Sequence, residues 1–108
     1  MERLDLLQGT LHMLVLKTLS QGPMHGHALA RSIKITTDHV LHPEEGTLYP
    51  ALYRMERRGW IISKWGVSEN NRKARYYRLT SSGRRQLARE TETWTNISAA
   101  IAKIMQTA

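Results

Sequence analysis

Apolar residues recur at helical spacing in the N-terminal part of the chain. Leu4, Leu7, Leu11 and Leu14 form one stripe with steps of three and four, which predicts a helix over about residues 4–20. Other apolar residues lie off this stripe, so the helix is apolar over much of its circumference. A surface helix of a monomer needs only one apolar face. We therefore expect this helix to contact its own core on one side and a second subunit on the other.

Two shorter helices are expected next. Gly22-Pro23 ends the first helix, and the second runs from about His25 to Thr37. The third begins between Glu44 and Leu48 and ends at Gly59. Pro50 is expected in its first turn, where a missing N–H is harmless. The core face of this helix is expected to comprise Leu48, Leu52 and Met55.

The remaining third of the chain predicts a β-hairpin and a long final helix. Strand-like residues at 60–65 and 74–79 flank a turn-rich segment with a basic tip. Thr80 to Ser82 offer an N-cap for a helix that continues to about Met105. Its stripe has coiled-coil-like spacing and comprises Leu87, Thr91, Trp94, Ile97, Ile101, Ile104 and Met105. The predicted fold is mainly α with a small β-hairpin, an α+β class.

The positive charge is concentrated on the third helix, the hairpin and the start of the last helix. Between Arg54 and Arg89 there are eleven Lys or Arg and two Glu, a net charge of +9. The rest of the chain has five basic and seven acidic residues. A helix joined to a cationic hairpin is how a winged helix meets duplex DNA. We expect a winged helix-turn-helix DNA-binding domain over residues 1–80, with the N-terminal helix also at a dimer interface, and a C-terminal dimerisation helix over residues 81–108.

Length and composition exclude several classes of protein. A chain of 108 residues forms one domain, or one domain plus an appended helix, and its 41% hydrophobic content supports a packed core. The absence of cysteine excludes disulfides and thiolate chemistry and is compatible with a cytoplasmic protein. The N-terminal apolar segment contains Glu2, Asp5, His12 and Lys17, so we expect neither a signal peptide nor a membrane span.

The third helix has the side chains of a major-groove reader. A major groove about 12 Å wide accepts one α-helix, anchored by one face and offering polar, aromatic and cationic groups on the other. We expect Thr47, Tyr49, Arg54 and Arg57 to approach DNA, with Arg54 on a base edge or a phosphate. The alternative is that Tyr49 and Tyr53 pack in the core. In that case Arg57 and Arg58 only solubilise the end of the helix.

The hairpin tip is expected to contact the DNA backbone. Its candidate residues are Asn71, Arg72, Lys73 and Arg75, which suit sugar-phosphate or minor-groove contact. Such contacts raise affinity without reading sequence. A solvated hairpin end is the alternative.

Trp94 is the candidate for ligand binding. It lies on the apolar stripe of the last helix among small and polar neighbours, where it could stack a planar hydrophobic effector or simply anchor an interface. The candidate dimer interface comprises Leu4, Leu7, Leu11, Leu87, Trp94, Ile97, Ile101, Ile104 and Met105.

The sequence contains no pattern of residues that is typical of a metal site or a catalytic site. The histidines at 25, 27, 39 and 42 lack the spacing and partner ligands of a zinc site. The chain contains no nucleophile elbow, paired carboxylates or Gly-rich phosphate loop. We therefore expect no metal, no cofactor and no enzyme activity.

Three segments resemble the PadR family of transcriptional regulators. They are LLQGTLHMLVLKTLSQGPMHGHALARSI at Leu6–Ile33, GTLYPALYRMERRGWI at Gly46–Ile61 and RKARYYRLTSSGRRQL at Arg72–Leu87. The resemblance implies a dimeric winged-helix protein, commonly a repressor, that binds an inverted-repeat operator in double-stranded DNA and is often released by a ligand. The single C-terminal helix is similar to the short subfamily, in some members of which a tryptophan of that helix lines a pore at the dimer interface.

A second class of function is a winged-helix module that binds other proteins and no DNA, using the apolar first and last helices. The charge of +9 on one structural unit argues against it. An anionic membrane surface fits worse, because the charge does not follow one amphipathic helix face. The sequence does not decide between repression and activation.

Overall fold

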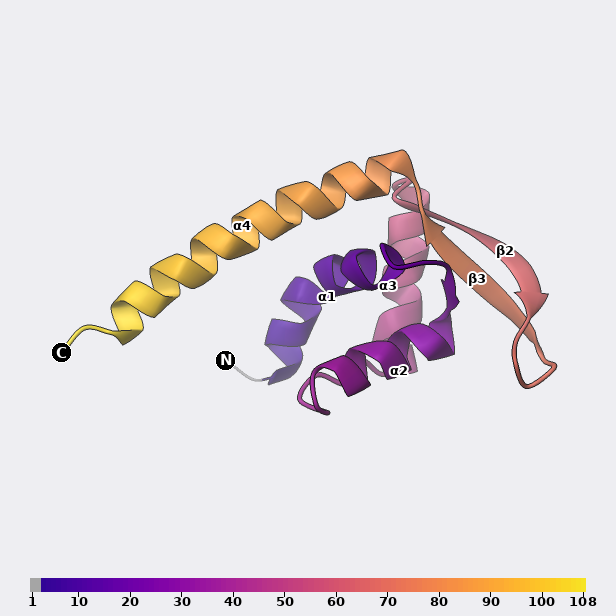
Figure 1. The fold of residues 1–108 in the computed structure, drawn as a ribbon, viewed down its shortest axis with the longest axis horizontal. Coiled ribbons are helices and arrows are strands. Elements are labelled where there is room, and N and C mark those ends of the chain that lie inside the picture. Colours follow the sequence, from indigo (N-terminus) through magenta and orange to yellow (C-terminus); the bar gives the residue numbers. More distant parts are fainter. Residues whose placement is uncertain (1–2) are drawn as a thin grey trace.

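The computed structural model describes the backbone of residues 3–108 and the side chains of residues 9–108. The described residues form four helices and a small antiparallel sheet, arranged as Figure 1 shows. In chain order the elements are α1 (Arg3–Leu19), β1 (Met24–His25), α2 (Gly26–Thr36), α3 (Glu45–Arg57), β2 (Ile61–Val67), β3 (Lys73–Leu79) and α4 (Ser81–Met105).

The predicted helices and hairpin are confirmed, and a third strand was missed. Strand β1 pairs with β3 through Met24 with Tyr77 and His25 with Tyr76, so the sheet has the order β1-β3-β2. The α+β class is therefore right, but the hairpin is not a free-standing pair of strands. Its central strand is tied to the residues that begin α2.

The core lies where α1, α2, α3 and the base of the hairpin meet. Helix α1 packs against the other three helices and β3. The buried core comprises Leu11, Val15, Leu16, Leu19, Leu29, Ile33, Leu48, Ala51, Leu52, Met55, Ile61, Tyr77 and Leu79. Leu48, Leu52 and Met55 thus form the core face of α3, as predicted.

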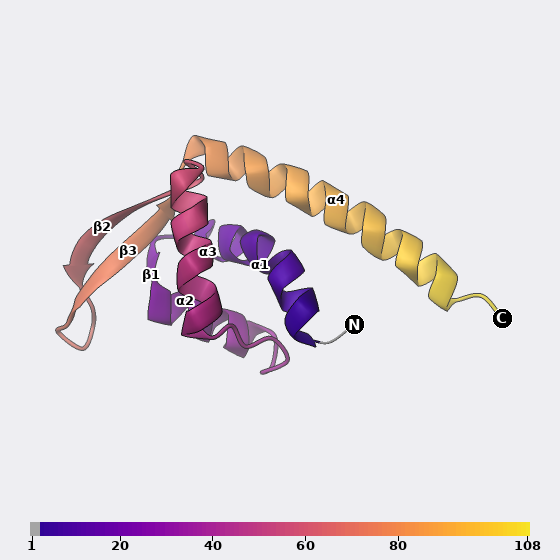
Figure 2. The same cartoon turned by 180° about the vertical axis from the view of Figure 1, so that it is seen from behind.

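Helix α4 begins at a tightly fixed junction. The Thr80 hydroxyl oxygen accepts from the Gly83 N–H at 3.0 Å, which is the N-cap expected from the sequence. The Thr80 N–H in turn donates to the Trp60 carbonyl at 3.1 Å. Leu87 still packs on the core, but beyond Glu90 the helix leaves it. The hairpin and α4 extend from the core in opposite directions (Figures 1 and 2), and the molecule measures 56 × 29 × 21 Å.

Two sequence expectations need correction, and two others lie outside the described side chains. Leu11, expected at a dimer interface, is buried in the core of its own chain and offers no surface to a partner. Pro50 lies in the interior of α3 rather than its first turn, because the helix begins as early as Glu45. The side chains of Leu4 and Leu7 fall in the part of α1 that the structure does not describe.

Candidate nucleic-acid interface

Helix α3 is fixed at its end by backbone geometry. Gly59 has a φ of +77°, a left-handed conformation that favours glycine. The Gly59 N–H donates to the Glu56 carbonyl, and the Trp60 N–H donates to the Met55 carbonyl at 3.1 Å. These two bonds form a Schellman motif. They stop the helix where the chain turns into β2, and so fix the angle between α3 and the hairpin.

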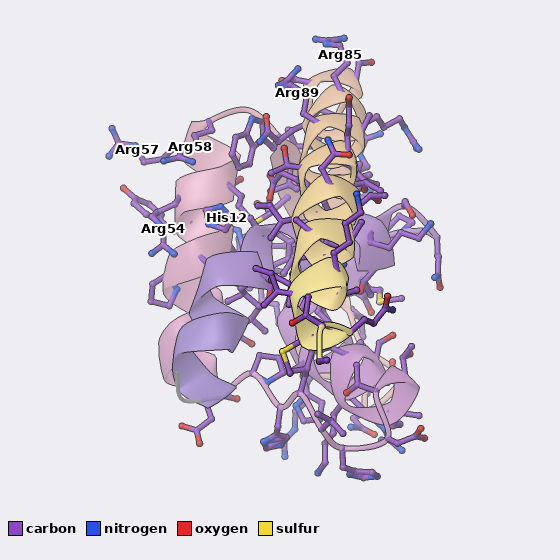
Figure 3. The ribbon with its side chains drawn as sticks, turned by 90° about the vertical axis from the view of Figure 1, so that its left-hand side faces the viewer. His12, Arg54, Arg57, Arg58, Arg85 and Arg89 are labelled. Carbon is purple, nitrogen blue, oxygen red and sulfur yellow. The ribbon has the colours of Figure 1, made fainter. Side chains whose placement is uncertain are left out.

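The exposed side of α3 has two flanks with different neighbours. Tyr49 faces the start of α2 and the hairpin, and it lines a cleft there. Thr47 and Arg54 lie on the other flank, where they line a hollow together with Leu11 of α1. Figure 3 shows Arg54 beside His12 of α1, with Arg57 and Arg58 further along α3. The residues predicted as one reading surface are therefore divided between the flanks.

Tyr49 is held in place by a close approach to α2. A Cβ atom added at Gly26 would lie 2.6–2.8 Å from two ring carbons and the hydroxyl oxygen of Tyr49, so any larger residue at 26 would displace the Tyr49 side chain. Burial raises the pKa of the Tyr49 hydroxyl above its usual value, and the Glu45 carboxylate adds to the effect. The hydroxyl therefore keeps its proton at neutral pH and can donate a hydrogen bond. Tyr49 contacts α2 but is 41% exposed and does not belong to the buried core, so its approach to DNA stays a prediction.

The hairpin presents one face that changes character along its length. At its base Ile61, Tyr77 and Leu79 are buried in the core. Because side chains alternate along a strand, the same face carries Trp65 on β2 and Lys73 and Arg75 on β3 further out. The sheet thus turns from core to cationic surface without changing face. We call this outer part of residues 65–75 the wing.

An aromatic ring gathers the cations of the wing. The Lys73 Nζ lies 5.2 Å and the Arg75 Cζ 5.5 Å from the centre of the Trp65 ring, which is within cation–π range. Arg75 is further oriented through Ser63: its Nε–H donates to the Ser63 hydroxyl at 2.9 Å, and that hydroxyl donates to the Glu56 carboxylate at 2.7 Å. This relay connects β3, β2 and α3, so the Arg75 charge is positioned relative to the reader helix.

The tip of the wing is a structured turn. The Ser68 N–H donates to the Arg72 carbonyl and the Asn71 N–H to the Ser68 carbonyl, both at 2.8 Å. Asn71 has a φ of +59°, a conformation that asparagine tolerates better than most residues. Arg72 and Asn71 are exposed there. The predicted wing residues are therefore brought together, with Asn71 serving the turn as well as offering an amide.

The structure adds aromatic residues that the sequence analysis did not select. Tyr53 is 61% exposed on α3, with the Arg57 guanidinium 5.8 Å from its ring centre. Trp65 is 58% exposed on the wing. Their spacing was the available signal: Tyr53 follows Tyr49 by one helical turn, and Trp65 alternates in phase with Ile61. Arg31 and Lys34 of α2 add positive charge and line a hollow of about 760 Å³ between α2 and the start of α3.

Comparison with known proteins identifies the family. The sequence profile of the "Transcriptional regulator PadR-like family" matches residues 15–89. The chain belongs to the PadR-like family.

Solved structures of similar regulators agree with this PadR-like fold. A transcriptional regulator from Clostridium thermocellum is 31% identical, with a TM-score of 0.83, over 92% of this chain and 96% of that one. A PadR family transcriptional regulator from Eggerthella lenta is 35% identical, with a TM-score of 0.80, over 97% and 89%. An uncharacterised protein from Lysinibacillus sphaericus is 26% identical over 98% of this chain and 97% of its own length.

The PadR-like family and the two solved structures are transcriptional regulators, not enzymes, so the chain is a winged-helix DNA-binding regulator. Within the described residues, no group of three or more His, Asp or Glu could hold a metal ion. None of the helices in that part of the chain is long and apolar enough to cross a membrane.

In this PadR-like chain, Trp94 lies in a groove between α1 and α4. The groove has a volume of about 320 Å³, and Met13, Trp94 and Ile97 form its apolar lining. Glu90 and Arg89 also line it, so the groove joins apolar and charged groups. Beyond it, the apolar stripe of α4 stays exposed and comprises Ile97, Ile101, Ile104 and Met105.

Proposed function

We propose that this chain is a homodimeric transcriptional repressor that binds an inverted-repeat operator. In this proposal α3 enters the major groove and the wing contacts the adjacent backbone. The observation that supports it most directly is the exposure of Tyr49 beside the same cleft as the Trp65–Lys73–Arg75 cluster, with Tyr53 exposed one helical turn further along α3. Aromatic and cationic groups combined in this way suit base edges and phosphates and do not suit an apolar protein partner.

The reader helix divides its contacts between its flanks. Tyr49 would approach bases and backbone on the wing side, Thr47 and Arg54 would serve the other edge of the same groove, and Tyr53 and Arg57 would lie on the exposed face between them. A major groove of about 12 Å holds a helix with side chains on both flanks, so both sets can reach DNA.

Dimerisation is supported by the uncovered apolar face of α4. Trp94, Ile97, Ile101, Ile104 and Met105 lie on that face at helical spacing and are 40–77% exposed, although Trp94 and Ile97 also line the groove beside α1. A face of this size on a soluble protein marks an interaction site. Two copies joined there would place their reader helices on a roughly palindromic site, about 34–36 Å apart for half-sites one helical turn apart.

A planar hydrophobic effector would bind in the groove at Trp94, and release of DNA would follow from a change in the separation of the two reader helices. Because α1 forms one wall of this groove and also packs against α3, a ligand there has a direct route to the reader helix. Tryptophan fluorescence with planar hydrophobic compounds, compared with a Trp94→Phe variant, tests this part.

Binding to mixed-sequence duplex and to the DNA upstream of the gene tests the core of the proposal. Salt-sensitive binding to both, with tighter binding to an inverted repeat, is the expected result. Tyr53→Ala should reduce the ratio of specific to nonspecific affinity while leaving the unfolding temperature nearly unchanged, because its side chain is exposed. A protein-only interaction module would show no salt-sensitive binding to either duplex.

A further inference from the structure

A cleft of about 580 Å³ separates the start of α2 from the wing. His25, Gly26 and Tyr49 form its inner wall. Arg72, Lys73 and Arg75 line its outer side. The cleft is therefore a recess with positive charge along one margin and the N-terminus of an 11-residue helix on the other.

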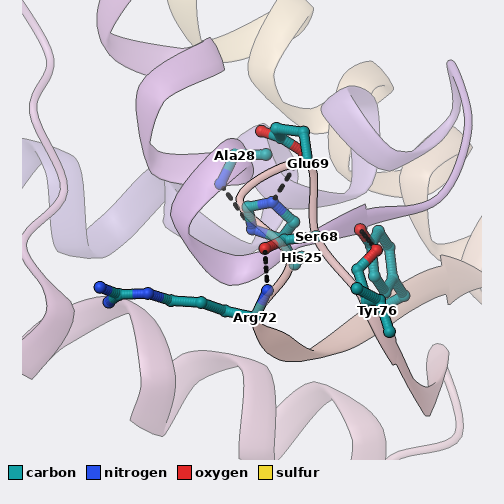
Figure 4. Close-up of polar contacts among 7 residues, drawn as sticks. His25, Ala28, Ser68, Glu69, Arg72 and Tyr76 are labelled. Carbon is teal, nitrogen blue, oxygen red and sulfur yellow. Dashed lines mark hydrogen bonds and ion pairs between the residues drawn. The ribbon is translucent and has the colours of Figure 1, made fainter.

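His25 places a hydrogen-bond donor in this recess. Its Nδ1 accepts from the Ala28 N–H at 3.2 Å and so caps α2 (Figure 4). In a neutral imidazole the proton then belongs to Nε2. That atom is buried and has no hydrogen-bond partner, and the residue as a whole is 8% exposed. A buried donor without an acceptor is costly, so this one calls for an explanation.

Glu69 approaches the donor without satisfying it. Its carboxylate oxygen lies 3.7 Å from the His25 Nε2, beyond normal hydrogen-bond distance (Figure 4). The pKa of Glu69 is lowered, first by a hydrogen bond with its own backbone, so the carboxylate stays ionised. Its side chain is 78% exposed, so it can turn away from His25 at little cost.

The start of α2 adds to the attraction for an anion. The first turn of the helix contains no acidic residue. Its leading N–H groups lack intrahelical partners and carry the positive end of the helix dipole. Gly26 lines the wall of the recess, with the Tyr49 side chain packed against it.

We propose that this recess binds one backbone phosphate of duplex DNA. The His25 Nε2–H and the N-terminus of α2 bind the phosphate oxygens, and Arg72 and Lys73 supply the compensating charge. In the free protein the Glu69 carboxylate takes the place of the phosphate and is displaced when DNA binds. This assignment rests on the proposed function, because it locates one contact within the proposed DNA interface.

The decisive variant is His25→Asn. Asparagine is a good N-cap, so helix α2 stays capped, but its shorter side chain cannot present a donor at the position of Nε2. On a mixed-sequence duplex we expect about tenfold weaker binding, the size of a hydrogen bond to a charged group. Because a neutral donor is lost, the slope of log K against log salt should stay unchanged. His39→Asn, an exposed histidine with positive φ that asparagine accepts, is the matched control.

Glu69→Gln tests the displacement independently of whether the His25 variant folds. Removing the competing carboxylate should tighten binding about threefold or more, whereas Glu92→Gln on exposed α4 should not. In the double variant with His25→Asn, most of the gain from Glu69→Gln should vanish, because the phosphate contact that Glu69 opposes is absent. If the effects of the two substitutions on DNA affinity are additive, Glu69 acts only as a charge that repels DNA in general, and the proposal is overturned.

Nuclear magnetic resonance of the His25 ring distinguishes the source of the phosphate. A shift of the Hε2 signal with duplex, but not with inorganic phosphate at the same phosphate concentration, supports the assignment. Equal shifts would overturn it in favour of a small-anion site. If wild-type protein binds duplex and His25→Asn binds equally well, only this inference fails. If the wild type shows no salt-sensitive binding at all, the proposed function itself fails.

Discussion

The wing and the distal part of α4 both project beyond the core, yet they are stabilised in opposite ways. The wing has its own network: two strands, a hydrogen-bonded turn, and the relay from Arg75 through Ser63 to Glu56. Distal α4 has only its helical backbone, and its apolar side chains face solvent. The wing is complete without a partner, whereas α4 exposes a face that water does not favour.

This difference separates two kinds of partner. A charged surface is well solvated in the free state, so its partner can come and go with salt and concentration. An exposed apolar stripe is unfavourable in water, so it is stabilised by a partner that stays bound and buries it. Under the proposed function, the wing would bind DNA reversibly and α4 would hold the subunits together. Each prediction below acts on one side of this comparison or on the junction between the two.

The largest effect is expected for Ile101→Asp on distal α4. Burying an unpaired carboxylate in a subunit interface should weaken dimerisation at least 100-fold, about 3 kcal/mol or more. Sedimentation velocity would show a particle of one chain mass where the wild type shows two. Ala99→Asp, on the opposite face of the same helix, is the control and should remain dimeric. A dimer that survives Ile101→Asp would place the interface elsewhere.

Gly83→Ala acts on the junction between hairpin and α4. An added Cβ would clash with the Trp60 carbonyl oxygen and would meet a Leu79 methyl group at 3.0 Å. Overpacking of this kind costs about 2–3 kcal/mol, or roughly 10 °C or more in unfolding temperature for a chain of this size. Gly46→Ala, where an added Cβ meets nothing within 4 Å, should change the unfolding temperature little. Thermal unfolding followed by circular dichroism measures the unfolding temperature of both variants. Equal unfolding temperatures for the two would show that the backbone at the junction can shift to accommodate the added methyl group.

Arg72→Ala with Lys73→Ala removes charge from the wing and leaves α4 untouched. Each lost phosphate contact should reduce the slope of log K against log salt by about 0.9, and affinity should fall alike for all duplex sequences. Fluorescence anisotropy at several salt concentrations measures both quantities. The oligomeric state should not change. An unaltered slope would remove these two residues from the interface.

The smallest effect concerns His12, near the junction of α1, α3 and α4. Its ring lies edge-on to Trp60 at 5.7 Å. Burial lowers the pKa of His12; the Glu90 carboxylate opposes this, and Arg54 and Arg58 reinforce it. The folded state therefore binds a proton less readily than the unfolded state, whose His pKa is about 6.5. Above about pH 6.5, His12 is neutral in both states and costs the folded state no stability. As the pH falls below 6.5 toward the lower pKa of His12 in the folded state, the free energy of unfolding decreases.

Unfolding temperatures between pH 8 and pH 5.5 test the His12 prediction. The wild type should lose stability over this range by more than a His12→Gln variant does. Parallel curves for the two proteins would show that His12 titrates no differently in the folded state.

The sequence predicted those elements in which apolar residues repeat at the spacing of a helix or a strand. The helices and hairpin follow from apolar spacing, and the Thr80 cap and the Gly59 stop follow from local chemistry. Strand β1 has two residues and no period. It is a strand only because Met24 and His25 pair with Tyr77 and Tyr76, more than fifty positions away.

The candidate site was predicted in composition but not in arrangement. A helical wheel already separates Thr47 and Arg54 from Tyr49, but it cannot show that α1 lies beside one flank and the wing beside the other. Leu11 fitted an apolar stripe that serves the core rather than a partner. The sequence places His25 at the start of the second helix, and in the structure it caps that helix; that its other nitrogen faces the wing depends on the fold.

Strand β1 has a consequence for how the molecule opens. Because its residues pair with the central strand of the sheet and its second residue caps α2, the wing cannot separate from the helix-turn-helix without exposing the α2 N-terminus. The two parts should therefore open as one cooperative unit, with matching hydrogen-exchange protection for the backbone amides of β3 and of the α2 amides bonded within the helix. Distal α4 is outside this unit and should exchange independently, at a rate that depends on subunit concentration.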